Sequence, residues 1–400
     1  MLSKTKIPVT ELRVGMYVAE LDRPWIGTPF ELQGFYITSP DQIAELGRWC
    51  KTVFIDVERD FQRDYVPTLP PRGQRVRGST VYPETATVEK EAPVAKKTYY
   101  EYQEVVQQTM DALLTDRSVD TKRLTGMVAS ISQSVQRNPD AMLMLVKLKQ
   151  KGEYEVRRAI DTSVLMITFG RFLQLSPERL DLLGIAGMML DVGKVKLPDA
   201  LLRNKGLLSP EQYQEVKLHV LHSIEIIRAT PGLPQGIAEI AWLHHERQDG
   251  SGYPRGLRGP EISLEGSISA IVDTFSALTS ERPYAPQYAP SDALNQLYKM
   301  RGTLYHGALV EQFIQCIGIY PVGSVVELNT GEIGIVIAQN LVRRLQPRVM
   351  VILDAGHQPV QPQVLLDLVK EPRATANQPY RIRRTLDPST LPMDPREFFL

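Results

Sequence analysis

The spacing of apolar residues changes several times along the chain, and each change marks a predicted boundary. The predicted segments are a small α/β domain at 1–61, a flexible linker at 62–98, a helical domain at 99–318, a β extension at 319–372 and a tail at 373–400. Because the helical segment is the longest, the pattern predicts a mainly α protein with small α/β and β parts at its ends.

The central segment has apolar residues three and four positions apart, which is typical of amphipathic helices. EVRRAIDTSVLMITFGRFLQL predicts a buried helix. SPERLDLLGIAGMMLDVG opens with Ser176 and Glu178 close to the spacing of a capping box and ends at Gly193, and SPEQYQEVKLHVLHSIEII predicts another capped helix. Residues 99–137 predict one or two long helices, which could pair between two copies of the chain to form a homodimer.

The two ends of the chain contain the two-residue alternation of β-strands. Near the N-terminus, IPVTELRVGMYVAEL and KTVFIDVE flank a helical pattern in SPDQIAELGRWC. Near the C-terminus, GSVVELNTGEIGIVIAQN predicts a hairpin that turns at Asn329-Thr330-Gly331, and RVMVILD adds a third strand. The linker is rich in Pro, Thr and charge and has no apolar period.

Charge and cysteine content narrow the function classes. The chain has 46 basic and 46 acidic residues, so it lacks the general electrostatic footprint of a protein that binds nucleic acid or a membrane surface. No apolar run approaches the roughly 18 residues of a membrane span, and the N-terminus lacks the apolar region of a secretory signal. Cys50 and Cys316 lie far apart and are expected to be buried, reduced thiols, so we expect a cytoplasmic protein.

Four of the six histidines lie close together in the sequence. They are His219, His222, His244 and His245. A single histidine on an apolar helix face is usually structural, but four of them together with Asp191 and Asp273 favour a metal site. Adjacent helical residues point about 100° apart, so His244 and His245 suit two neighbouring ions that a carboxylate such as Asp191 bridges. Two such ions clamp the attacking and leaving oxygens of a phosphate ester and lower the pKa of bound water.

The stretch HHERQDGSGYPRGLRGPEISLEGSISAIVDTFSALTSERPY, residues 244–284, resembles the signature of the HD-GYP family. Members of that family are HD-type metal-dependent phosphohydrolases that hydrolyse the bacterial messenger cyclic di-GMP. The resemblance extends over residues 140–318 and implies an all-helical HD-domain core. IPVTELRVGMYVAELDRPWIGTPF resembles an uncharacterised domain that often precedes HD-GYP, and GIYPVGSVVELNTGEIGIV resembles the usual extension of that class.

The resemblance implies a set of metal ligands, five of which are present. They are Asp191, His219, His244, His245 and Asp273. The His that normally precedes the Asp of the His-Asp doublet is Leu190, which cannot ligate a metal. The His of the preceding helix aligns with Arg158, which has no lone pair to give. The family and the ligand types imply iron or manganese, and the two losses leave open whether its occupancy is full, reduced or nil.

The resemblance also implies residues that act on the nucleotide. The expected catalytic residues are Asp191 and Lys194, and the expected substrate contacts include Lys194, Tyr253 and Arg282. Two further family positions are lost, because a Lys is replaced by Ala285 and an Asp by Ser276. The expected signature loop is Gly252, Tyr253 and Pro254.

Arg158 has a second interpretation, as a substrate-binding residue that replaces a metal ion. A guanidinium can pair with Asp191 or Asp273 and bind a phosphate bidentately, which would turn a cleaving site into a holding site. A structure with Arg158 pointing to solvent beside a filled metal cluster would refute this hypothesis. The remaining candidates nearby are interpreted as structural residues, namely Glu246, Asp249 and His222.

Three functions remain open. The first is an HD-GYP-type cyclic di-GMP signalling protein with a depleted hydrolytic site, which acts as a nucleotide sensor or an interaction scaffold. The second is an active metal-dependent cyclic di-GMP phosphodiesterase. The third is an interaction module that binds no nucleotide and contacts signalling proteins through the GYP loop or the N-terminal domain. The losses at 190 and 158 favour the first over the second, and the survival of Lys194, Tyr253 and Arg282 favours it over the third.

Overall fold

The computed structural model describes residues 4–12, 16–23, 35–37, 40–56, 75–115, 117–148, 154–202, 204, 206, 208–280, 288–340, 342–375, 377–386 and 391. The chain divides into two compact units, Met1–Gln74 and Arg75–Leu400. Each unit has a hydrophobic core of its own.

The first unit is a four-stranded antiparallel sheet with one helix. Its elements are β1 (Lys4–Pro8), η1 (Val9–Glu11), β2 (Tyr17–Leu21), β3 (Phe35–Tyr36), α1 (Pro40–Trp49) and β4 (Thr52–Asp56), and the strand order is β1-β4-β2-β3. Val18, Val53 and Ile55 of the sheet and Leu46 of the helix are buried together. The alternation of apolar residues in the strands therefore places one face of the sheet on the helix.

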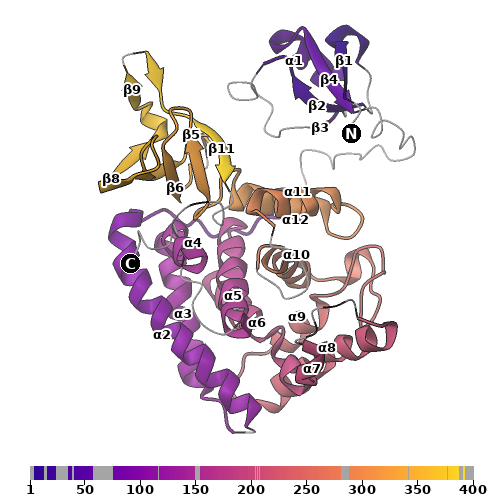
Figure 1. Ribbon diagram of the computed structural model, residues 1–400. Coiled ribbons are helices and arrows are strands. Elements are labelled where there is room, and N and C mark those ends of the chain that lie inside the picture. The colour runs from indigo at the N-terminus through magenta and orange to yellow at the C-terminus, as the bar shows by residue number, and fades with distance from the viewer. Residues whose placement is uncertain are drawn as a thin grey trace. The chain divides into compact units, whose positions relative to one another are not determined.

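The second unit is mainly helical and is built around α5. Its helices are α2 (Val88–Leu114), α3 (Thr121–Arg137), α4 (Pro139–Leu148), α5 (Tyr154–Phe172), α6 (Pro177–Met189), η2 (Val192–Lys196), α7 (Asp199–Leu202), α8 (Pro210–Ala229), α9 (Ile237–Leu243), η3 (Gly259–Glu261), α10 (Leu264–Leu278), α11 (Pro290–Lys299) and α12 (Gly307–Ile317). Figure 1 shows α5 in the middle of this bundle, and it packs against α2, α3, α4, α6, α10 and α12. This position explains why every residue of α5 from Thr162 to Gly170 is buried.

Side-chain caps fix where two of the helices around the site begin. Ser209 and Gln212 form a capping box at the start of α8, and the Ser263 side chain accepts a hydrogen bond from the backbone N–H of Gly266 at the start of α10. Such caps satisfy backbone donors that the first turn of a helix leaves unpaired.

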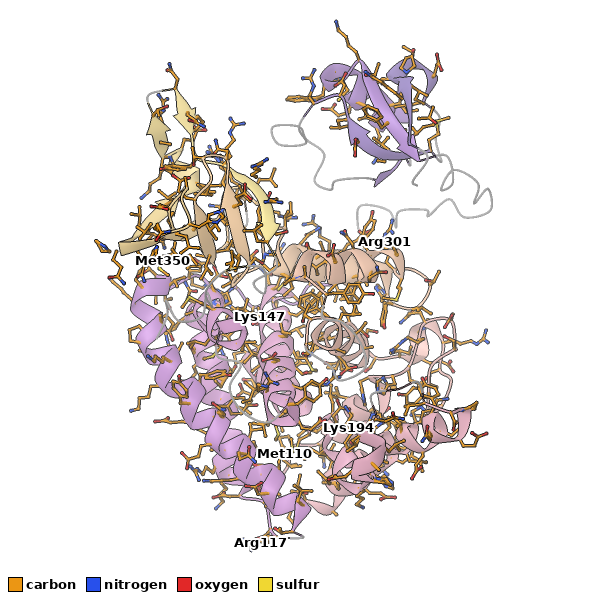
Figure 2. All side chains as sticks on the ribbon, viewed as in Figure 1. Met110, Arg117, Lys147, Lys194, Arg301 and Met350 are labelled. Carbon is orange, nitrogen blue, oxygen red and sulfur yellow. The ribbon has the colours of Figure 1, made fainter. Side chains whose placement is uncertain are left out.

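The C-terminal part of the second unit is a five-stranded antiparallel sheet. Its strands are β5 (Val325–Leu328), β6 (Ile333–Ala338), β7 (Arg348–Leu353), β8 (Pro359–Asp367) and β11 (Ile382–Leu386), in the order β11-β5-β6-β7-β8. The predicted hairpin at Asn329-Thr330-Gly331 connects β5 to β6. The small elements η4 (Leu368–Lys370), β9 (Arg373–Thr375) and β10 (Gln378–Pro379) lie between β8 and β11. Figure 2 shows Met350 of β7 well away from Lys194, so the sheet is remote from the site described below.

The predicted linker is wrong over its second half. Residues 88–98 are the first turns of α2, and Gly78 donates a backbone hydrogen bond to the carbonyl of Leu173 at 2.7 Å. Glu91 is buried because Arg137 and Ser134 of α3 bond to its carboxylate. These partners lie far away in sequence, so a local pattern rich in charge and proline does not reveal the helix. Residues 62–74 of the predicted linker lie outside the described residues.

The predicted tail also contains a strand. β11 pairs with β5, and Arg383 and Arg384 of β11 form ion pairs with Glu327 of β5 at 2.8 and 2.6 Å. The strand was missed because its charged residues are neutralised by a partner about 55 residues earlier, which a local pattern does not reveal.

The predicted fold class is confirmed, since a mainly helical core is flanked by a small N-terminal α/β unit and a C-terminal β extension. Residues 99–137 form parts of two helices, α2 and α3. Cys50 and Cys316 are both buried and free, as expected. Within the described part of the chain, no helix combines the length and the apolar character that crossing a membrane requires.

Candidate metal centre

Four side chains from three parts of the helical bundle converge on one point. Asp191 lies between α6 and η2, His219 lies on α8, and His244 and His245 follow α9. One ligand atom from each of these residues lies within 4.8 Å of the others. Four of the five predicted metal ligands are thus brought together.

A close backbone contact holds Asp191 against α8. A side chain at Gly193 would place its Cβ 2.1 Å from the carbonyl oxygen of His219, so only glycine fits there. The Ser223 hydroxyl donates to the carbonyl of Leu190 and accepts from the N–H of Gly193, both at 2.8 Å. The turn that carries Asp191 is therefore fixed to the helix that carries His219.

Backbone carbonyls set the orientation of two imidazoles. Nδ1 of His219 lies 2.6 Å from the carbonyl oxygen of Val216, and Nδ1 of His244 lies 2.5 Å from that of Ala241. Because a carbonyl oxygen only accepts, each Nδ1 carries a proton, and in the neutral ring Nε2 then presents a lone pair. This is the second interaction that metal-bound histidines usually make.

The lone pairs converge on an oxygen of Asp191. Nε2 of His219 and of His244 lie 3.3 and 3.9 Å from Oδ1 of Asp191. Burial lowers the pKa of His219 to about 4, so its imidazole is neutral near pH 7 and the short distance is not an ion pair. Among the described residues, these three atoms are buried and have no hydrogen-bond partner. An unsatisfied buried polar group costs about 1–3 kcal/mol, and a divalent ion among them would satisfy all three.

His245 completes the set from the side of the GYP loop. Burial and the neighbouring His244 lower the pKa of the His245 imidazole well below its ordinary value, which keeps it available as a neutral ligand. Its ring stacks on Tyr253 with centroids 4.7 Å apart, and the backbone N–H of Tyr253 donates to the His245 carbonyl at 3.1 Å. Three imidazoles and one carboxylate oxygen are a donor set that suits a first-row transition metal.

The other oxygen of Asp191 faces two cations. Oδ2 lies 2.9 Å from Nζ of Lys194 and 3.1 Å from Nε of Arg158. Burial alone would raise the pKa of Asp191, but the Lys194 ammonium and the Arg158 guanidinium outweigh it and hold that pKa well below its ordinary value. Nη2 of Arg158 also donates to Oδ1 of Asp273. Asp273 therefore contacts Arg158 and lies outside the four-residue cluster.

The GYP loop is anchored by Glu246, as its structural interpretation expected. The Glu246 carboxylate is buried and accepts from the backbone N–H groups of Arg255 and Leu257 at 2.7 and 2.9 Å. A Cβ at Gly252 would lie 2.4 Å from the backbone nitrogen of Arg247, so the loop requires glycine at this position of the signature Gly252, Tyr253, Pro254. Asp249 also acts within the loop, where its Oδ1 accepts from the backbone and the hydroxyl of Ser251.

The remaining predicted residues lie elsewhere. His222 is outside the cluster, with Nδ1 3.4 Å from Glu225 of the same helix. Leu190 is buried in the apolar core. Arg282 and Ala285 lie outside the described residues, so the prediction for Arg282 stays a prediction.

Sequence reasoning missed several supporting residues. The carbonyls of Val216 and Ala241 and the hydroxyl of Ser223 have no side-chain signature that would single them out. Lys217 could have been noticed, because it lies four positions after Tyr213 on one helix face. Its Nζ lies 4.7 Å from the ring centre of Tyr213 and 5.2 Å from that of Tyr253.

Comparison with protein families divides the chain into three matches. An HD domain matches residues 140–309, a KOW domain associated with HD domain matches 325–384, and a domain of unknown function, DUF3391, matches 4–124. The last match runs past the first structural unit into α3.

One relative covers almost the whole chain. A cyclic di-GMP phosphodiesterase of Pseudomonas aeruginosa is 31% identical over 377 residues, which are 91% of this chain and 88% of that protein. The chain belongs to the HD-GYP family. Two further relatives match a shorter part of the chain. A cyclic di-GMP phosphodiesterase of Thermotoga maritima is 40% identical over 32% of this chain and 36% of its own length. A 3'3'-cGAMP-specific phosphodiesterase of Vibrio cholerae is 35% identical over 35% of this chain and 27% of its own length.

Proposed function

We propose that this HD-GYP chain binds cyclic di-GMP beside a single divalent ion and hydrolyses it weakly or not at all, acting as a nucleotide sensor or scaffold in signalling. The observation that carries this proposal is the composition of the cluster. Asp191 Oδ1 and three imidazoles suit one ion, whereas the adjacent position 190 is a buried leucine that supplies no further ligand. The Pseudomonas relative, which carries the name cyclic di-GMP phosphodiesterase, supports the choice of nucleotide.

The residues around the cluster have separate roles in this proposal. A divalent ion held there would act as a Lewis acid toward a phosphate and lower the pKa of a water molecule. Lys194 and Arg158 place positive charge beside the same carboxylate and favour a phosphodiester anion. Tyr253 offers a ring on which a base can stack. Iron or manganese is the proposed ion, because a mixed histidine and carboxylate set suits both.

An active phosphodiesterase is the second candidate. It is favoured by the three buried atoms of Asp191, His219 and His244 that have no hydrogen-bond partner among the described residues. These atoms can still ligate an ion although position 190 supplies no ligand. One experiment separates the candidates. Purified chain is kept anaerobic, supplied with iron(II) or manganese(II), and incubated with cyclic di-GMP or 3'3'-cGAMP, with the linear products quantified by chromatography. Calorimetry on the same samples measures nucleotide binding.

The outcomes of this experiment are distinct. Binding of cyclic di-GMP with little linear product supports the proposal. Rapid turnover that the substitution His244→Ala removes supports the active enzyme instead. If neither nucleotide binds in the presence of metal, the proposal fails and an interaction module without nucleotide remains. A double variant, Leu190→His with Arg158→His, is expected to increase turnover if the rest of the site is sound.

A further inference from the structure

We infer that Arg158 is a built-in cation that occupies the place of a second metal ion, linking Asp191 to Asp273 and limiting the centre to one ion. The inference deepens the proposed function and rests on the metal cluster assigned there. It concerns how many ions the site takes, which is separate from whether a nucleotide binds.

The first support is the geometry of the guanidinium. Arg158 extends from α5, Asp191 precedes η2 and Asp273 lies on α10, so one side chain ties three elements together. Its Nε donates to Asp191 Oδ2 at 3.1 Å, and its Nη2 donates to Asp273 Oδ1. Arg158 is only 8% exposed. A guanidinium keeps its charge at any physiological pH and has a rigid fork of donors, so it can link two carboxylates as a metal ion would.

The second support is the way the oxygens of Asp191 are shared. A carboxylate that bridges two ions through both of its oxygens gives one oxygen to each ion. In this chain Oδ1 faces the unpaired Nε2 atoms of His219 and His244, whereas Oδ2 accepts from Lys194 and Arg158. The second oxygen is therefore already used by two N–H donors. An ion could bind there only after both donors had moved away.

The third support is Asp273, the remaining carboxylate at the centre. It is 4% exposed and is held by Arg158, so its charge is already compensated. The residue one helical turn later is Ser276, whose hydroxyl accepts from Thr162 at 3.5 Å and adds no negative charge. A second ion beside Asp273 would therefore meet a carboxylate that is already paired with a fixed cation.

The charges in direct contact point the same way. Asp191 and Asp273 contribute two negative charges, and Arg158 and Lys194 contribute two positive charges, so the contacting group is neutral before an ion binds. One divalent ion raises the total to plus two, which a phosphodiester and a hydroxide would balance. A second would raise it to plus four in a buried site, where repulsion between cations is strong.

The test counts ions in the absence of nucleotide. Metal-free full-length chain is equilibrated with manganese(II), freed of excess ion, and analysed by mass spectrometry for ions per chain. Electron paramagnetic resonance then distinguishes an isolated manganese ion from an exchange-coupled pair. We expect about one ion and an uncoupled spectrum for the wild type. For Arg158→His, which removes the cation and adds a ligand, we expect about two ions and a coupled spectrum.

Matched variants keep the result interpretable. Arg179→His makes the same substitution at a half-exposed ion pair with Glu265, and it is expected to leave the count at one. Arg158→Lys keeps the charge and is also expected to hold one ion. If Arg158→His does not fold, Arg158→Gln takes its place, with a weaker second ion expected.

Each result decides between the claims. Two ions in the wild type, or a count that stays at one in Arg158→His (in Arg158→Gln where the His variant does not fold), would overturn the role of Arg158 while leaving nucleotide binding untouched. A wild type that takes up no ion would instead overturn the metal cluster of the proposed function. A count of one that rises on removal of Arg158 supports the inference even if cyclic di-GMP does not bind.

Discussion

The two oxygens of Asp191 face two different halves of one site. The ligand half contains Oδ1 and the imidazoles of His219, His244 and His245, and three of its atoms are buried without a hydrogen bond in the described part of the chain. The cation half contains Oδ2, Arg158, Lys194 and Asp273, and its charges are paired. The unsatisfied atoms of the ligand half lower the stability of the fold unless an ion binds, whereas the charges of the cation half are paired without an ion.

This difference indicates that the two predicted ligand losses are not equivalent. Position 190 holds an uncharged leucine that is buried in the apolar core. Position 158 holds a charged arginine that pairs with two carboxylates. A substitution that introduces a charge changes what its neighbours can bind, so it has the larger effect on the centre.

The largest expected effect is on stability and concerns the cation half. Asp273→Ala leaves the buried Arg158 with one carboxylate fewer, and breaking a buried pair on one side costs about 3–5 kcal/mol. We expect a loss of this size in the free energy of unfolding, measured by urea titration without metal. Glu265→Ala breaks the half-exposed pair with Arg179 and is expected to cost less than about 1 kcal/mol. Equal losses in the two variants would contradict the assignment of Asp273.

The next effect concerns the ligand half. His244→Ala removes a ligand, and because losing even an outer-shell partner costs about 10–100-fold in metal affinity, we expect at least about a 100-fold loss here. Titration calorimetry with manganese(II) measures it. His222→Ala is the matched control, because His222 lies three residues from His219 but outside the cluster. The manganese affinity of this variant should equal that of the wild type. Similar losses in both variants would argue against the cluster.

A smaller effect is expected at Ser223, whose hydroxyl holds the turn that carries Asp191. Ser223→Ala leaves the N–H of Gly193 and the carbonyl of Leu190 without their partner, at a cost of about 2 kcal/mol. Because the same bonds fix Asp191 against α8, metal affinity should fall with stability. Urea titration and calorimetry on one preparation test both. A loss of stability with unchanged manganese affinity would show that the Ser223 hydroxyl does not position Asp191.

The smallest expected effect separates nucleotide from metal. Tyr253→Leu removes a stacking surface worth about 1–3 kcal/mol per base, so we expect about tenfold weaker binding of cyclic di-GMP. Tyr253→Phe keeps the ring and should bind as the wild type does. Manganese affinity should be the same in all three proteins, and a parallel loss would mean that Tyr253 acts through His245.

The ligands could be predicted because the sequence carries them in a recognisable order. The resemblance over residues 140–318 implies Asp191, His219, His244 and His245, and the pairing of Arg158 with an acidic residue follows from its fixed charge. The sequence hypothesis allowed Asp191 or Asp273 as its partner, and the structure places both against it. The position of Asp273 relative to the cluster could not be predicted, because the sequence does not show whether the Asp273 carboxylate lies nearer to Arg158 or to the metal site.

The regions that were misread share one physical cause. In each region, charged residues pair with partners from distant segments, because Glu91 of the helix pairs with Arg137, and Arg383 and Arg384 of the strand pair with Glu327. A high local density of charge indicates an exposed segment only where no opposite charge from a distant segment pairs with it. The helix at 88–98 and the strand at 382–386 both have such long-range ion pairs.

The anchoring of the loop by Glu246 has a consequence for how this chain can vary in length. His245 faces the ion site and the next residue holds the backbone of Arg255 and Leu257, so one peptide bond separates a ligand from a loop anchor. An inserted residue between them would rotate one out of place whichever position the other kept. Insertions and deletions within residues 244–257 should therefore abolish metal binding, and a library of single-codon insertions across this segment should contain no metal-binding clones.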